Sequence, residues 1–184
     1  MTTALADELV GTYTLDAAHS RIGFSARHAM VTKVRGAFNE FEGTANLPTS
    51  DPHSWNVAVT IQAGSIDTRN EQRDGHLRGN DFLLLDEHPT ITFTSTSVEH
   101  LSDSTFRVTG DLTVRGVTRP VSVDFEYEGS ATDPFGNARV GFEGSVSISR
   151  KDFGITWNAA LDTGGVLVSD KIDLEFEISA IKAA

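Results

Sequence analysis

The chain has 184 residues, contains no cysteine and carries a formal net charge of −11. This length suits one all-β domain, and the lack of cysteine excludes disulfides, thiolate metal sites and cysteine nucleophiles. The acidic balance disfavours nucleic acid and anionic lipid headgroups as partners, because their phosphates repel a negative surface.

Residues 1–10 precede the first strand pattern, and we expect them to form a loose arm of a single domain spanning 1–184. The opening residues lack a basic region, and Asp7 and Glu8 interrupt the apolar run. A secretory signal peptide begins with a basic region, and a membrane-spanning helix needs an unbroken apolar stretch. The sequence therefore predicts a cytoplasmic protein without a membrane span.

From about residue 12 onward, apolar side chains recur at every second position in a series of short segments. This period is typical of strands with one buried face, and many such strands in succession predict an all-β, antiparallel up-and-down barrel of about eight strands. The predicted strands are Thr12–Asp16, Arg21–His28, Arg35–Leu47, Trp55–Ala63, Thr90–Val98, Phe106–Arg115, Pro120–Gly129, Ala138–Ile148 and Ile172–Ala180.

One polar stretch between the fourth and fifth predicted strands breaks the alternation. Thr68 is a candidate helix N-cap, with Glu71 three residues later as its capping-box partner. Gly75 weakens the middle of this segment. We expect one or two short helices near residues 68–85, crossing one end of the barrel like a lid.

Several local motifs resemble the YceI-like family and follow one another in the family's order from about Tyr13 to Ile178. The most specific is Gly110–Pro120, which reads GDLTVRGVTRP, and Ser149–Ile155 is the next most specific. The remaining motifs are Tyr13–Asp16 with His19–Ser20, Lys33–Gly36 with Phe38, Ile66–Thr68, Arg73–Leu77, Asp81–Phe82 and Pro89–Phe93.

The resemblance implies a lipocalin-like barrel that holds a long apolar molecule. Members of this family are described as polyisoprenoid-binding, with isoprenoid quinones and prenyl phosphates among their ligands, and homodimers are common. We therefore expect the chain to bind a long-chain isoprenoid or similar amphiphile as a carrier or storage protein. The same resemblance implies a homodimer, and we expect no cofactor and no metal.

The aromatic composition suits an apolar interior, with 11 Phe against two Trp and two Tyr. Phe adds apolar surface without a polar group that needs a partner inside the barrel. The alternative is that these side chains pack together and fill a solid barrel. The sequence alone favours this filled barrel, whereas the resemblance favours a hollow one. The predicted cavity lining consists of Phe24, Phe38, Phe93, Val108, Val123, Phe125, Phe142, Val146 and Phe176.

The polar stretch also supplies headgroup candidates, namely Arg69, Arg73, His76 and Arg78. A guanidinium pairs well with phosphate oxygens at a barrel mouth. The competing interpretation, which we favour, is that Arg73 and Asp74 pair with neighbouring groups and hold the lid in place, because a polar connection needs its own hydrogen bonds. A structural role is likewise favoured for Arg150 and Asp152.

Motifs that indicate an enzyme are not found in the sequence. It contains no nucleophile elbow, no phosphate-binding glycine loop and no dinucleotide fingerprint, and its six histidines are scattered. We expect a binding protein rather than an enzyme. Two alternatives stay open: an enzyme that acts on an apolar substrate through Arg73, Asp74 and His76, and an interaction module with a solid barrel.

Overall fold

The computed structural model describes residues 2–162 and 164–184. The strands are β1 (Gly11–Leu15), β2 (Arg21–His28), β3 (Thr32–Phe38), β4 (Phe41–Leu47), β5 (Asn56–Gln62), β6 (Ile66–Asp67), β7 (Thr90–His100), β8 (Thr105–Val114), β9 (Val117–Thr132), β10 (Ala138–Ser149) and β11 (Lys171–Lys182). The helices are α1 (Thr2–Glu8) and α2 (Glu71–Arg78), with 3₁₀ turns η1 (Ala17–His19), η2 (Pro52–Ser54), η3 (Ala63–Ser65) and η4 (Arg150–Phe153).

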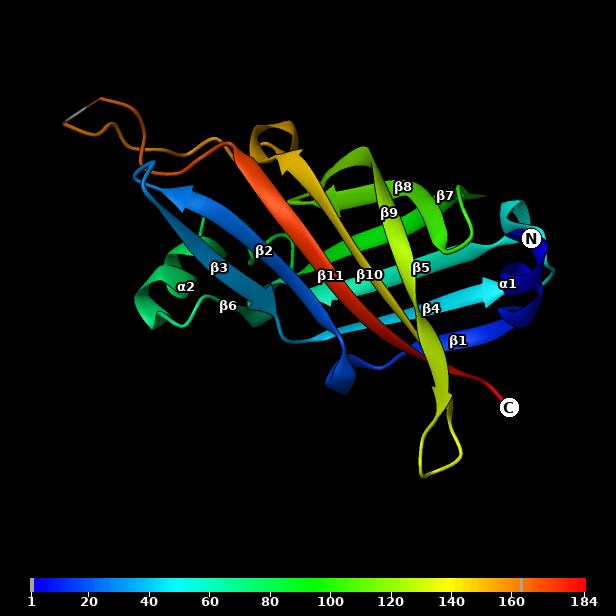
Figure 1. Ribbon diagram of the computed structural model, residues 1–184. Coiled ribbons are helices and arrows are strands. Elements are labelled where there is room, and N and C mark those ends of the chain that lie inside the picture. The colour runs from blue at the N-terminus through cyan, green and yellow to red at the C-terminus, as the bar shows by residue number, and fades with distance from the viewer. Residues whose placement is uncertain (1, 163) are drawn as a thin grey trace.

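The strands form one antiparallel sheet that closes into a barrel. Eight of them, β1, β4, β5 and β7 to β11, make the ring, and the pairing of β1 with β11 closes it. β11 is shared, because Asp173–Glu177 pairs with β2 whereas Ala180–Lys182 pairs with β1. β2, β3 and β6 thus extend the wall at one end (Figure 1). The predicted barrel of about eight strands is confirmed.

The predicted strand Arg35–Leu47 is wrong as a single element. It divides into β3 and β4, with a break at residues 39–40. β3 pairs with β2 and β6, whereas β4 pairs with β1 and β5. At this break the chain passes from one part of the wall to another. Apolar alternation is present on both sides of residues 39–40, so the pattern resembles one continuous strand.

The expected loose arm at residues 1–10 is wrong, because this segment contains the helix α1. Ala6 and Leu9 are buried at 1% and 2% exposure and pack with Tyr13, Trp55 and Val98. The Tyr13 hydroxyl donates to the Leu9 carbonyl at 3.0 Å. A seven-residue helix is too short to leave a clear period in the sequence, yet it covers the barrel end opposite α2 (Figure 1).

α2 confirms the helix expected near residues 68–85, but its N-cap is Asn70 and not Thr68. The Asn70 side chain accepts a hydrogen bond from the Arg73 backbone N–H at 2.9 Å. Thr68 instead binds Asp74, as described below. α1 and α2, the two α-helices of the described residues, have seven and eight residues, and neither could span a bilayer.

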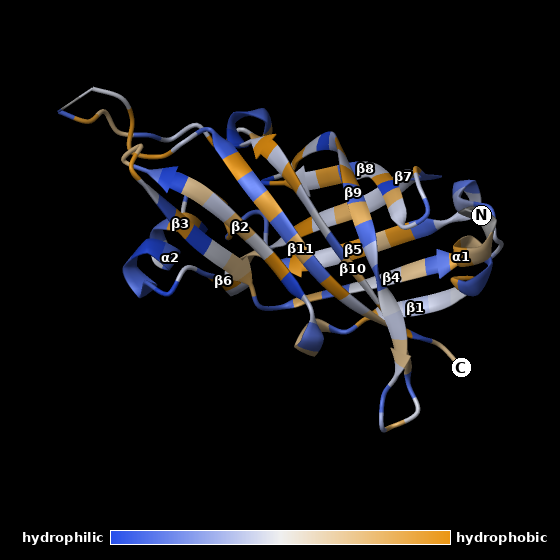
Figure 2. Cartoon of the chain, viewed as in Figure 1, coloured by the Kyte–Doolittle hydropathy of each residue, from blue (hydrophilic) through white to orange (hydrophobic). Residues whose placement is uncertain are grey.

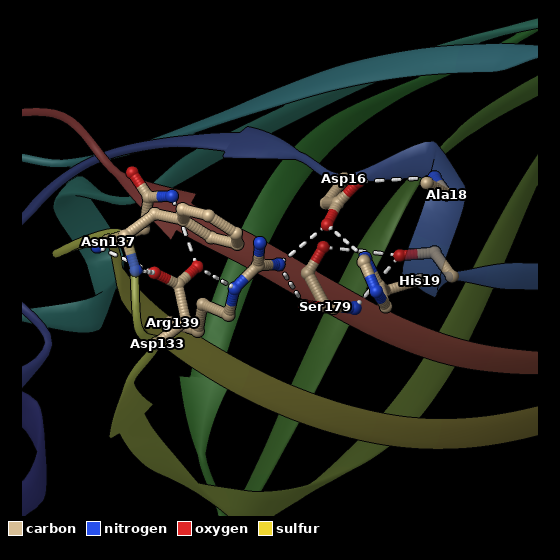
Figure 3. A network of polar contacts seen from close by, with 9 residues as sticks. Asp16, Ala18, His19, Asp133, Asn137, Arg139 and Ser179 are labelled. Carbon is tan, nitrogen blue, oxygen red and sulfur yellow. Dashed lines mark hydrogen bonds and ion pairs between the residues drawn. The ribbon is translucent and has the colours of Figure 1, made fainter.

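A polar network ties the β9–β10 hairpin to the point where β11 changes partner (Figure 3). Arg139 donates to Asp133 at 2.7 Å and to Asp16, which also binds His19. The Asp16 backbone N–H donates to the Ser179 carbonyl at 2.9 Å. The network therefore joins β10, β11 and the η1 turn on the outside of the barrel.

This network should make stability depend on acid pH. The Arg139 guanidinium holds the pKa of both Asp133 and Asp16 below the ordinary value of 3.8. Lowered folded-state pKa values stabilise the protein above pH 3.8, and this contribution is lost as the pH falls through them. Arg139→Gln should therefore lower the urea midpoint at pH 7, and its deficit against wild type should shrink as the pH falls below about 4.

The control is Arg119→Gln, since Arg119 is exposed and, among the described residues, its side chain donates to the adjacent Thr118 carbonyl alone. Urea unfolding at a series of pH values measures both variants. A deficit for Arg139→Gln that stays constant from neutral to acid pH would contradict the assigned role of Asp133 and Asp16.

Candidate functional site

The barrel encloses a cavity of about 790 Å³ whose wall is mostly apolar. Hydrophobic and hydrophilic residues alternate along β11 as orange and blue bands (Figure 2). The hydrophobic ones line the cavity, namely Ile172, Leu174, Phe176 and Ile178. At the α1 end the wall is made by buried Leu9, Tyr13 and Trp55. At the α2 end it includes the exposed His28 and His76, so the cavity opens to solvent there.

All nine residues predicted to line the cavity lie on its wall. Val108 and Val123 are buried, and the other seven keep some accessible surface. The cavity of about 790 Å³ leaves the barrel hollow, so the solid-barrel alternative does not hold for this structure. Their contribution to ligand binding stays a prediction.

Three inward Phe rings lie over glycines of neighbouring strands. A Cβ on Gly36 would come 2.4 Å from the Phe24 ring, and a Cβ on Gly144 would come 2.8 Å from Phe125. Phe93 covers Gly110 in the same way, at 2.5 Å. These glycines give the rings room to lie against the wall, because any larger residue would push them toward the cavity.

The headgroup candidates do not form one site. Arg73 and His76 lie on the cavity wall near its opening, whereas Arg69 and Arg78 do not. Arg69 is exposed, and Arg78 donates to the Gly64 and Ile66 carbonyls, which attaches α2 to the neighbouring chain. Arg78 therefore has a structural role in these contacts.

Arg73 makes part of the lid and also faces the opening. Its Nε donates to the Thr68 hydroxyl and its Nη2 to the Thr68 carbonyl, each at 2.7 Å. Neither contact uses Nη1. Arg73 can therefore hold α2 and still offer N–H groups to a ligand at the mouth.

Asp74 and His76 take separate partners. Asp74 is 4% exposed, and its carboxylate accepts from the Thr68 backbone N–H at 2.9 Å and from the Thr68 hydroxyl. His76 pairs with Asp81 at 2.9 Å and stacks edge-on against Trp157, with ring centroids 4.8 Å apart. Asp74 thus fastens the lid, which is the structural interpretation of that residue.

The segment after β10 forms part of the cavity wall, and the strand prediction gave it no element. Ile155, Trp157, Leu167 and Val168 line the cavity from this segment. The spacing of two between Ile155 and Trp157 is the signal that the sequence offered.

Arg150 holds this segment, and its side chain is buried at 4% exposure. Its guanidinium donates at 2.9 Å to the carbonyls of Ser169, Ile155 and Trp157, and at 3.3 Å to that of Val168. Burial lowers the pKa of Arg150. The structural role predicted for Arg150 therefore agrees with its contacts, and Asp152 lies exposed in η4.

Fold and cavity together define a class: a lipocalin-like antiparallel barrel with an apolar internal chamber, closed at one end and ringed by polar groups at the other. Comparison with known proteins identifies one family within this class. The model of the YceI-like domain matches residues 13–180, and the chain belongs to this family.

Related sequences and structures agree with this assignment. The chain is 38% identical over 169 residues to a UPF0312 protein of Staphylococcus aureus (strain MSSA476), covering 91% of this chain and 95% of that protein. A UPF0312 protein of Pseudomonas paraeruginosa is 38% identical over 164 residues, covering 89% and 82% of the two chains.

Solved structures share the fold. Burkholderia cenocepacia BcnA superposes with a TM-score of 0.78 at 22% identity, covering 90% of this chain and 98% of that one. A Campylobacter jejuni YceI protein gives 0.72 at 29% identity, covering 86% and 90%. A polyisoprenoid binding domain from Saccharophagus degradans gives 0.70 at 14% identity, covering 93% and 98%.

Proposed function

We propose that this protein binds a long-chain isoprenoid or similar amphiphile, with the chain inside the barrel and the polar head at the α2 end. The observation that carries the proposal is the 790 Å³ apolar cavity that opens at one polar mouth. Its volume falls in the upper part of the range of about 300 to 1,000 Å³ usual for ligand sites. The polyisoprenoid binding domain with the same fold supports this ligand class.

The physical basis is burial of hydrocarbon. Each Å² of apolar surface removed from water contributes about 25 cal/mol, less the cost of ordering the chain. Affinity should therefore rise with each isoprene unit until the cavity is full. Titration of delipidated protein with prenyl alcohols of increasing length tests this, and an affinity that does not depend on length would contradict it.

Arg73 is the proposed headgroup contact. Arg73→Ala should weaken a prenyl phosphate by about tenfold, because a charge-assisted hydrogen bond is lost, and should affect the matching prenyl alcohol much less. Calorimetric titration of both ligands measures the difference. Arg69→Ala is the matched control, since Arg69 lies outside the cavity wall, and equal losses for both ligands would exclude the headgroup role.

Binding without turnover fits the separate partners of Asp74 and His76, which offer no joint acid–base pair. A carrier or storage role, a cytoplasmic location and a homodimeric state stay predictions. Cell fractionation and sedimentation equilibrium measure the last two. Transfer of a bound prenyl chain to acceptor protein or membrane measures the first.

A further inference from the structure

Exposed apolar side chains gather beside the mouth of the cavity. Met30 is 65% exposed and Val31 74% exposed, both in the turn between β2 and β3, and Val166 is 42% exposed in the facing loop. We call these three residues the rim patch. Exposed apolar side chains that adjoin one another mark an interaction surface, whereas single ones are ordinary.

The two segments that carry the rim patch are held together. The Ala29 N–H donates to the Leu167 carbonyl at 2.7 Å, and His28 forms a β-bridge with Val168. The Met30 sulfur lies against Gly165, where an added Cβ would be only 2.2 Å from it. His28, Leu167 and Val168 also line the cavity, so the rim patch continues into the cavity wall.

The turn that presents Met30 is strained. Ala29 and Met30 have φ values of 51° and 63°, the left-handed region that two-residue hairpin turns usually fill with Asn-Gly. Met30 is exposed, so packing inside the barrel does not explain why Met occupies a position with positive φ. Strained backbone is concentrated at ligand clamps and other functional sites, which makes the tip a candidate for such a role.

Positive charge lies directly behind this apolar tip. Residues 27–35 include Arg27, Lys33 and Arg35 and no acidic residue, in a chain of net charge −11. Arg27 and Lys33 are opposite each other in the β2–β3 register, two to three residues from the tip, or about 7 to 10 Å along the strand. Two carboxylates lie nearby, Asp162 in the facing loop and Asp173 on β11, whose charge interacts with that of Lys33. The three cations of the hairpin outnumber them, so the local charge stays positive.

We propose that the rim patch docks the protein onto an anionic lipid bilayer. Met30, Val31 and Val166 enter the interface, while Arg27 and Lys33 meet lipid phosphates, an arrangement that matches the depth of about 5 to 10 Å at which interfacial segments sit. The acidic remainder of the protein is repelled, which turns the hairpin toward the membrane. The overall charge disfavours anionic lipid as a general partner, and this hairpin is the local exception.

The purpose of this docking rests on the proposed function, the binding of an apolar chain. A mouth held at the headgroup level lets an apolar chain pass between bilayer and cavity without crossing water. Docking itself needs no cargo and is measured separately from cavity binding.

Vesicle sedimentation of the full chain tests the proposal, with vesicles of phosphatidylcholine and phosphatidylglycerol or of phosphatidylcholine alone. Wild type should sediment with the mixed vesicles, less so as salt rises. The double variant Met30→Asp with Val31→Asp should bind them about tenfold more weakly or worse. Arg27→Gln with Lys33→Gln should lose the preference for the mixed vesicles.

Phe135→Asp is the matched control, because Phe135 is 88% exposed at the tip of the β9–β10 hairpin, away from the mouth. It should sediment like wild type. Equal sedimentation of wild type and the Met30/Val31 variant would overturn the proposal. So would a wild-type dimer that becomes a monomer in this variant, since the patch would then be an interface between two copies.

Prenyl alcohol binding in solution separates this inference from the proposed function. The Met30/Val31 variant should keep it, because these side chains lie outside the cavity wall. If no form of the protein binds a prenyl alcohol, the proposed function fails, and the vesicle result still decides docking.

Discussion

Phe125→Asp is expected to abolish binding of an added prenyl chain and to lower the free energy of unfolding by about 3 to 5 kcal/mol. The Phe125 ring lies on the cavity wall, covers Gly144, and packs 5.8 Å from the Phe176 ring centroid. A carboxylate there has no partner of opposite charge among the apolar side chains of this wall. Urea unfolding and prenyl titration measure the two effects.

A companion variant keeps the fold and blocks the cavity. Val146→Trp places an indole in the chamber from β10 and should weaken prenyl binding by about a hundredfold while leaving unfolding cooperative. Ser145→Trp is its control, because Ser145 is the exposed, outward-facing neighbour on the same strand. If Val146→Trp bound a prenyl chain as well as wild type does, the ligand would not occupy this cavity.

Arg150→Met is expected to lower the free energy of unfolding by about 3 kcal/mol or more. Removing the guanidinium takes this donor from the carbonyls of Ser169, Ile155, Trp157 and Val168. The Val168 carbonyl keeps the Asn158 amide as a donor, and an acceptor shielded from water that loses its partner is costly. The segment from Gly154 to Asp170 should then exchange its amide hydrogens faster. Because this segment supplies part of the cavity wall, prenyl affinity should fall as well.

Two further variants make this prediction specific. Arg150→Lys keeps the charge but not the planar fork, so it should recover only part of the stability. Lys151→Met removes an exposed neighbouring cation and should be close to neutral. A change of less than about 0.5 kcal/mol for Arg150→Met would show that the four hydrogen bonds do not hold the segment.

The barrel and its lining could be predicted because both follow from one period. In a strand, every second side chain faces the same side of the sheet. The repeat therefore predicts one shared interior for residues as far apart in sequence as Phe24 and Phe176. The glycines opposite Phe24 and Phe125 carry part of the same information, since they mark where rings lie against the wall. The resemblance then favoured a hollow barrel over a filled one.

Structural features that leave no periodic pattern in the sequence could not be predicted. α1 is a short helix whose burial depends on contacts with Trp55 and Val98, far along the chain. The segment held by Arg150 is organised by a side chain rather than by a backbone ladder. The division of the headgroup candidates, with Arg73 at the mouth and Arg78 bound beneath the lid, follows from the direction of α2, which composition does not encode.

Native mass spectrometry of the protein as purified from cells tests the central claim most directly. A cavity that holds a long apolar chain predicts a mass increment equal to one lipid per chain, present in wild type and in Ser145→Trp and lost in Val146→Trp. A bare chain mass for wild type, together with no uptake of an added prenyl alcohol or isoprenoid quinone, would contradict it.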